Sequence, residues 1–136
     1  MPAVPGFAQS SLLVALGGGL GAWLRYVTGR AWALAAGPDA ASGFPAATLT
    51  VNVVGSVAMG LLAGWLARHG SAGEGWRLLL GVGVLGGFTT FSAFSLELAL
   101  MIERGQPGLA LFYAALSLAA GVLGLFAGLA AIKALA

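Results

Sequence analysis

The chain has 136 residues, of which 60% are hydrophobic and only 7% are charged. Soluble domains carry about 25% charged residues, so this composition excludes a soluble enzyme and a nucleic-acid-binding protein. A helix needs about 20 mainly apolar residues to cross the hydrocarbon core of a bilayer. Uncharged stretches of that size comprise 24 residues before Arg25, 28 after Asp39, 19 after Arg77 and 28 after Arg104. They predict an all-α, multi-pass membrane protein whose residues 1–136 form one domain with four transmembrane helices.

The first predicted span covers residues 8–33 and is rich in glycine between residues 17 and 21. Arg25 and Arg30 lie in its last third. The Arg25 side chain could reach the membrane interface with its charged end, or it could place positive potential at the mouth of a pore. The loop that follows contains Gly37, Pro38 and Asp39, which are typical turn residues.

The second predicted span covers residues 46–67 and carries a polar stripe. Thr48, Asn52 and Ser56 recur four residues apart, so they share one face of the helix. Polar side chains in hydrocarbon are costly and tend to be functional, and the Asn amide offers two donors and one acceptor. Two interpretations of Asn52 stay open at this point. It either contributes to a functional path or holds two helices together by hydrogen bonding.

The third predicted span covers residues 76–102 and is interrupted by the sequence GGFTT at residues 86–90. Adjacent glycines weaken a helix and Thr adds little helix propensity, so we expect a break here rather than a simple kink. A break frees backbone carbonyls at membrane depth, where protein or an ion must satisfy them. Carbonyls at broken helices are known to hold Na⁺. A turn at residues 103–107 precedes the fourth predicted span, residues 108–132.

Two aromatic residues follow the expected break. Phe91 and Phe94 are spaced i, i+3 and therefore share a helix face. The edge of a Phe ring is electropositive, so these rings could face a small anion, although core packing is the ordinary role of such a pair. Their polar neighbours Thr89, Thr90, Ser92 and Ser95 favour the first interpretation. Glu97 could cap a helix, pair with Arg25 or Arg104, or mark a proton or cation path.

Small residues recur four apart in every predicted span. These sets are Gly17/Gly21, Ser56/Gly60/Gly64, Gly83/Gly87 and Gly124/Gly128. Such pairs let helix backbones approach closely inside a bilayer. We interpret most of them as helix-packing positions.

The few charges barely select an orientation in the membrane. With four spans, the N-terminus, the second loop and the C-terminus lie on one side, which carries Arg68, Arg77 and Lys133. The other side carries Arg30 and Arg104, with Arg25 uncertain. A difference of three against two or three is a weak bias under the positive-inside rule. This weak bias permits insertion in both orientations and hence an antiparallel homodimer. Alternatively, the weak bias only reflects how few charges the chain has.

Three motifs resemble the Fluc/CrcB family of fluoride channels, and the resemblance covers most of the chain. They are GGLGAWLRY at residues 18–26, TLTVNVVGS at residues 48–56 and GGFTTFSAFS at residues 86–95. Their occurrence in this order, in a four-span chain of this length, makes the resemblance specific. Ala93 is a departure, because Thr is common between the two Phe residues in the family, and any role of that hydroxyl is lost here.

The resemblance implies a fluoride-selective channel of the cell membrane that exports F⁻ passively and protects the cell against fluoride toxicity, and not an enzyme. It implies a dual-topology, antiparallel homodimer within the lipid bilayer, with two separate pores and no nucleic-acid partner. Two rival interpretations come from other classes of protein. One is a small dual-topology, proton-coupled transporter that uses Glu97, and the other is a structural membrane subunit.

The resemblance also implies roles for individual residues. The Asn52 amide donates to fluoride, and the ring edges of Phe91 and Phe94 line the pores. The backbone carbonyls of Gly86 and Thr89 hold a central structural Na⁺. Further candidate pore residues are polar side chains that lie near these positions or on the fourth span: Thr48, Thr90, Ser92, Ser95, Tyr113 and Ser117. Arg25 and Glu97 are candidate vestibule or structural charges.

Overall fold

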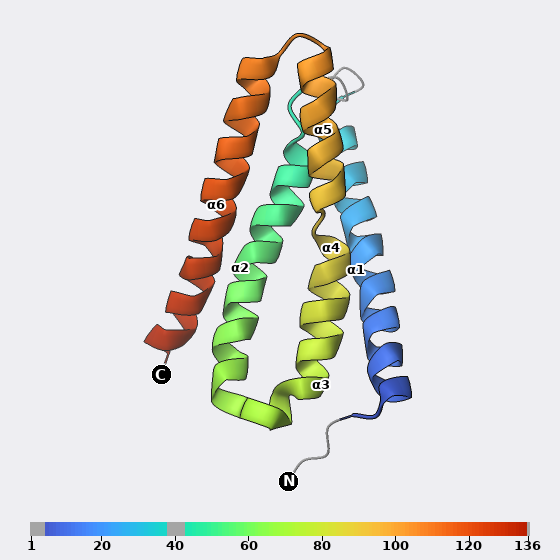
Figure 1. Ribbon diagram of the computed structural model, residues 1–136, viewed down its shortest axis with the longest axis vertical. Helices are drawn as coiled ribbons and strands as arrows, with labels where there is room; N and C mark the ends of the chain where they lie inside the picture. Colours follow the sequence, from blue (N-terminus) through green and yellow to red (C-terminus); the bar gives the residue numbers. More distant parts are fainter. Residues whose placement is uncertain (1–4, 38–42, 136) are drawn as a thin grey trace.

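The computed structural model describes residues 5–37 and 43–135, so Pro38 and Asp39 of the first loop lie outside the described residues (Figure 1). Four helices are long and apolar enough to cross a membrane: Phe7–Ala36, Ala46–His69, Glu74–Glu103 and Pro107–Ala134. Each of their ends lies within three residues of the predicted end. The prediction of an all-helical protein with four membrane-spanning helices is therefore confirmed.

The helices follow one another in a simple up-and-down order. The described elements are α1 (Phe7–Ala36), α2 (Ala46–His69), η2 (Gly70–Gly73), α3 (Glu74–Trp76), η3 (Arg77–Leu85), α4 (Gly86–Phe88), α5 (Phe91–Glu103) and α6 (Pro107–Ala134). Figure 1 shows the start of α1, the end of α6 and the α2–α3 connection at one end of the bundle, with the α5–α6 turn at the other. This is the arrangement of ends that four spans require.

Glycine residues bring the helix backbones close together. The helix α2 packs along α6, and α1 packs along η3 and α4. A Cβ atom at Gly60 would collide with the Leu125 carbonyl oxygen, and one at Gly128 would collide with the Val57 carbonyl oxygen. Gly21 meets the Val84 carbonyl oxygen in the same way. These positions therefore act in helix packing, because hydrogen in place of a side chain permits the close approach.

The segment η3 is a nine-residue π-helix, which the sequence pattern did not predict. Its wider winding is visible where it ends, since the amide of Gly86 donates to the carbonyl of Gly81, five residues earlier. Helices of this kind are rare and occur mostly as single turns, often at functional sites. Here the π-helix lies directly before the short helix α4 and the interruption that follows it.

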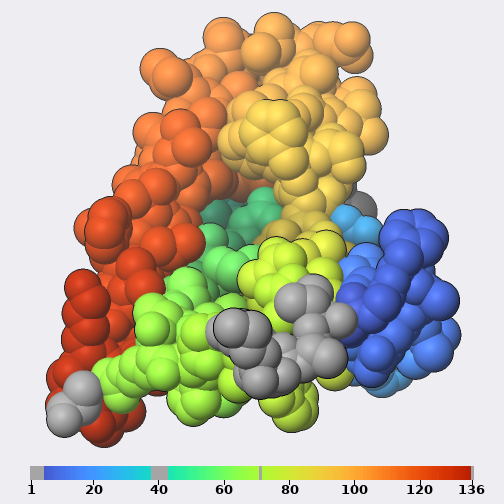
Figure 2. Space-filling view, turned by 60° about the horizontal axis from the view of Figure 1, so that its bottom comes forward, coloured from blue at the N-terminus to red at the C-terminus, as the bar shows by residue number. Residues whose placement is uncertain are grey.

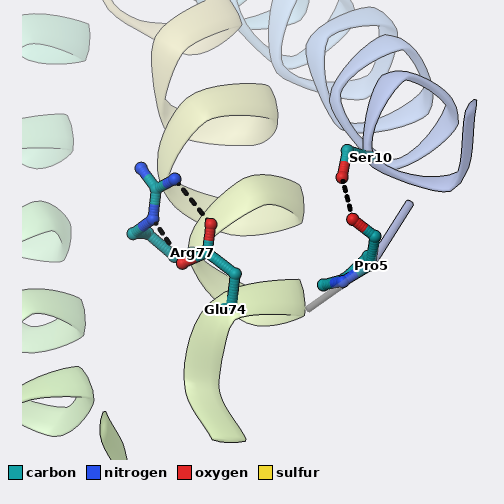
Figure 3. A network of polar contacts seen from close by, with 4 residues as sticks. All are labelled: Pro5, Ser10, Glu74 and Arg77. Carbon is teal, nitrogen blue, oxygen red and sulfur yellow. Dashed lines mark hydrogen bonds and ion pairs between the residues drawn. The ribbon is translucent and has the colours of Figure 1, made fainter. Parts of the chain in front are cut away.

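Three hydrogen-bonded pairs lie at the end of the bundle where α1 begins, and Figure 3 shows two of them. Nε and Nη2 of Arg77 donate to the two carboxylate oxygens of Glu74, at 2.8 and 2.7 Å. Oγ of Ser10 donates to the carbonyl of Pro5 at 3.2 Å. Nη2 of Arg68 donates to the carbonyl of Ile132 and so joins the ends of α2 and α6. Arg68, one of the basic residues that bear on membrane orientation, therefore also links two helices at this end of the bundle.

Candidate functional site

The third span leaves helical geometry at two residues. Thr89 (φ −80°, ψ 159°) and Thr90 (φ −151°, ψ 121°) are extended, and they separate α4 from α5. Thr90 is the N-cap of α5, and its Oγ1 accepts a hydrogen bond from the amide of Ala93 at 3.2 Å. A hydroxyl cap of this kind is a standard way to begin a helix. The two glycines thus weaken the end of α4, and the second of the two threonines caps the start of α5.

Asn52 on α2 binds Thr90 at two points. Its Nδ2 donates to the carbonyl of Thr90 at 3.0 Å, and its Oδ1 accepts from the amide of Thr90 at 2.8 Å. The side chain therefore satisfies both backbone groups of a residue outside any helix, which is essential at membrane depth. Because the amide nitrogen carries two hydrogens, this bond uses one of the two donors of Asn52.

The same interruption redirects two backbone donors. In a continuous helix, the amide of Thr90 would donate to the carbonyl of Gly86, and the amide of Ala93 would donate to that of Thr89. Here the first donates to Asn52 and the second to the Thr90 hydroxyl. Gly55 of α2 lies against Thr89, and a Cβ atom there would collide with the Thr89 methyl group. The carbonyls of Gly86 and Thr89 therefore do not accept the hydrogen bonds that these two amides would donate in a continuous helix.

A groove of about 290 Å³ lies beside this junction. Its lining comes from α2, α6 and the start of α5: Asn52, Gly55, Ser56, Met59, Thr89, Thr90, Phe91 and Leu125. Figure 2 shows the surface hollowed between α6 and the third span, with α2 at the bottom of the hollow. Phe91 and Phe94 are in contact, with ring centroids 5.8 Å apart. The structure therefore gathers Asn52, Thr90 and Phe91 around one opening.

A second polar cluster forms around Glu97. Oγ1 of Thr48 donates to Oε1 of Glu97 at 2.6 Å, and the hydroxyl of Tyr113 donates to Oε2 at 2.8 Å. Tyr113 is fully buried and packs against Phe94, with ring centroids 5.1 Å apart. Phe94 thus lies between Phe91 and the Glu97 cluster. Each residue of this cluster was a candidate from the sequence, but the pattern gave no sign that the three side chains meet.

Glu97 also lines a cavity of about 390 Å³ at the end of the bundle opposite the start of α1. The helix α5 contributes Glu97, Leu100, Met101 and Arg104, while α1 and the start of α2 supply most of the remaining wall. Trp32 of α1 borders the cavity, and its Nε1 donates to Oγ1 of Thr50 at 3.1 Å. The sequence pattern did not predict this cavity. The i, i+3, i+4, i+7 spacing of its α5 residues was the available signal.

The remaining candidates occupy different surroundings. Oγ1 of Thr89 donates to the carbonyl of Leu85, and Oγ of Ser95 donates to that of Phe91, so both hydroxyls bind the backbone four residues earlier in the same span. Oγ of Ser92 lies 3.4 Å from Oγ1 of Thr90. Oγ of Ser117 is buried and has no hydrogen-bond partner within the part of the chain that the structure describes. Arg25 is half-buried on α1.

Comparison with known proteins places the chain among a defined set of relatives. The model of the family described as CrcB-like protein, Camphor Resistance (CrcB), matches residues 12–129. A fluoride-specific ion channel FluC of Novosphingobium aromaticivorans is 59% identical over 127 residues, which cover 93% of this chain and 98% of that protein. Fluoride-specific ion channel FluC 2 of Nitrobacter hamburgensis is 54% identical, covering 90% and 95%. The FluC protein of Caulobacter vibrioides is 53% identical, covering 87% and 91%.

Proposed function

Because the chain belongs to the CrcB family, we propose that it is a fluoride-specific ion channel of the cell membrane through which fluoride leaves the cell passively. The observation that carries this function is 59% identity to a fluoride-specific ion channel over 93% of the chain. The protein is not an enzyme. HF crosses a bilayer as a neutral weak acid and dissociates at neutral pH, which traps F⁻ inside. A negative-inside potential drives an anion outward with about 2.3 kcal/mol per 100 mV.

Fluoride passes from the groove beside Asn52, along Phe91 and Phe94, to the cavity that Glu97 lines. Two observations support this path. Phe91 lines the groove and Glu97 lines the cavity, and ring contacts link Phe91 to Phe94 and Phe94 to Tyr113. The second N–H of Asn52 and the electropositive ring edges replace part of the hydration shell of F⁻. They hold the ion without a fixed positive charge, so it can leave again.

Two copies of the chain assemble in opposite orientations, and each dimer has two pores. The Phe91 side chain supports this assembly, because it is 79% exposed although it borders the groove with Asn52 and Thr90. A second copy would supply the missing wall of that path. The weak charge bias between the two ends of the bundle permits both orientations. The lipid bilayer covers the apolar surface outside the dimer contact.

A structural Na⁺ is held by the backbone carbonyls of Gly86 and Thr89 and by the same pair from the second copy. Support comes from the hydrogen bonds at the interruption, since the amides of Thr90 and Ala93 donate to side-chain oxygens instead of these carbonyls. Carbonyl oxygens at broken helices are suitable Na⁺ ligands. When bound, the ion would supply the positive charge that satisfies these oxygens at membrane depth.

Ion flux from liposomes containing the purified protein tests the function. We expect rapid, electrogenic fluoride efflux that needs no proton gradient, with chloride efflux much slower. The binding of Glu97 by Thr48 and Tyr113 makes a proton-coupled transporter the second candidate. Efflux that requires a pH gradient and disappears in Glu97→Gln would establish that transporter instead. If no anion crosses at all, the protein is a structural subunit and the proposal is wrong.

Replacement of Na⁺ tests the cation site. When every solution contains N-methylglucamine in place of Na⁺, we expect fluoride efflux to fall by roughly tenfold or more, because a cation that binds only the assembled state stabilises it by mass action. Dimer content, measured by crosslinking in the same samples, should fall in parallel. Restoring Na⁺ to the same vesicles serves as the control. Equal efflux and equal dimer content in both cations would remove the site.

A further inference from the structure

We infer that Phe44 is a positioning residue of the proposed channel: it holds the ring of Tyr113 in the place from which the hydroxyl binds Glu97. This inference rests on the proposed function. Phe44 lies in the loop before α2 and outside the three sequence motifs, so neither the motifs nor the proposed path gave it a role. It acts on the path through its contact with Tyr113, and fluoride does not need to touch it.

The backbone around Phe44 is fixed although it lies outside any helix. Pro45 follows it and is the N-cap of α2, with φ −80° and ψ 64°. These angles form an inverse γ-turn, which is closed by a hydrogen bond of 2.8 Å from the amide of Ala46 to the carbonyl of Phe44. A proline restricts its own φ and the conformation of the residue before it. The turn therefore gives the Phe44 side chain a defined starting position, as a rigid support requires.

Two phenyl rings contact the ring of Tyr113. The centroid of Phe44 lies 5.3 Å from that of Tyr113 at an interplanar angle of 79°, which is an edge-on arrangement. The centroid of Phe94 lies 5.1 Å from that of Tyr113 at an angle of 58°. Edge-on pairs are favourable beyond the area they bury, because the electropositive edge of one ring meets the electronegative face of the other. Since Tyr113 is also fully buried, the two contacts leave its ring little freedom to move.

The position of the Tyr113 ring decides what charge Glu97 presents to the cavity that it lines with Phe44. The hydroxyl of Tyr113 donates to Oε2 of Glu97 at 2.8 Å, while Oγ1 of Thr48 donates to Oε1 at 2.6 Å. Such donors offset the negative charge of a carboxylate, and a negative charge without them repels a passing fluoride ion. The hydroxyl is at the far end of the ring, so a displaced ring would break the bond to Oε2. Loss of the Phe44 ring should therefore slow fluoride at this end of the path.

Phe112 provides a matched control for Phe44. It precedes Tyr113 on α6, and its ring centroid lies 6.3 Å from that of Phe44. Its side chain is exposed, and it is not among the described residues that line the cavity. Phe112→Leu removes an aromatic neighbour of Phe44 and leaves both ring contacts of Tyr113 in place. Phe44→Tyr is the conservative variant, because it keeps the aromatic ring.

A double-mutant cycle separates positioning from packing. Tyr113→Phe keeps the ring that Phe44 contacts and removes only the hydroxyl. If Phe44 acts through this hydroxyl, Phe44→Leu should slow efflux in the unaltered protein but add little to the effect of Tyr113→Phe. A role in packing alone would instead slow efflux by the same factor in both backgrounds, because independent effects add as free energies.

The experiment measures fluoride efflux from liposomes that contain each variant. We expect Phe44→Leu to slow efflux by roughly threefold to tenfold, and Tyr113→Phe to slow it by at least as much. The double variant should be slower than Tyr113→Phe by no more than about twofold. Phe44→Tyr and Phe112→Leu should both conduct within about twofold of the unaltered protein. Size-exclusion chromatography shows whether each variant is folded, and Phe44→Met takes the place of Phe44→Leu if that variant is not.

Three results would overturn the role of Phe44. Unaltered efflux in Phe44→Leu would mean that the ring does not act on the path. An equal loss in both backgrounds of the cycle would assign Phe44 to packing alone. Unaltered efflux in Tyr113→Phe would remove the hydroxyl through which Phe44 acts. Failure of the unaltered protein to conduct fluoride would contradict the proposed function itself, so the two failures are distinguishable.

Discussion

Replacement of Phe91 or Phe94 by Ile is expected to slow fluoride efflux by roughly tenfold or more, since each 1.36 kcal/mol added to a barrier slows a step tenfold. Ile keeps the apolar character of the side chain but has no electropositive ring edge to face the anion. Phe91 is 79% exposed in one chain, so its replacement removes little packing there. Efflux from liposomes measures the effect, and size-exclusion chromatography shows whether each variant stays folded.

Phe126→Ile is the matched control for these two variants. Phe126 lies on α6 and is exposed, and it borders neither the groove nor the cavity. Its replacement should therefore leave efflux unchanged. Efflux at the unaltered rate in both Phe91→Ile and Phe94→Ile would exclude the aromatic residues from the permeation path.

Replacement of Asn52 by Ala is expected to lower both the stability and the fluoride efflux of the protein. The change removes the partner of the Thr90 amide and of the Thr90 carbonyl. Each buried polar group left without a partner costs about 1–3 kcal/mol, so the loss is roughly 2–6 kcal/mol. Thermal unfolding in detergent measures the stability, and liposome efflux measures the function.

Ser56→Ala is the control for Asn52→Ala. Ser56 lies one turn further along α2 and lines the same groove, but its hydroxyl donates only within its own helix, to the carbonyl of Asn52. Its removal should change unfolding by far less. If Asn52→Ala abolishes efflux but leaves stability unaltered, Asn52 acts only through contact with the ion. Unaltered efflux would rule out that contact.

The four spans could be predicted from the sequence because charge is excluded from long stretches of the chain. The interruption at residues 86–90 could also be predicted, because its glycines and threonines are weak helix formers. Thr90, the last of them, caps the helix α5 that follows. Several glycine positions could be assigned to helix packing from their spacing. These features depend on residues close together in sequence, where helix geometry alone fixes what can meet.

The partners of Asn52 and Glu97 could not be predicted in the same way. Asn52 binds a residue 38 positions away, and Glu97 binds residues 49 and 16 positions away on two other helices. Such contacts depend on how each helix is rotated about its axis. The π-helix η3 changes that rotation just before the interruption, and nothing in the local sequence indicates its wider winding. The cavity beside Arg104 depends on the same helix arrangement.

The paired hydrogen bonds between Asn52 and Thr90 have a mechanical consequence. A two-residue gap between helices would ordinarily act as a hinge, about which α5 could swing relative to α4. Bonds to both the amide and the carbonyl of one residue instead fix the start of α5 in position and in orientation against α2. The junction between α4 and α5 is thus held rigidly against α2. On the proposed fluoride path, discrimination between ions would then come from fixed geometry, and the joint itself would not need to open.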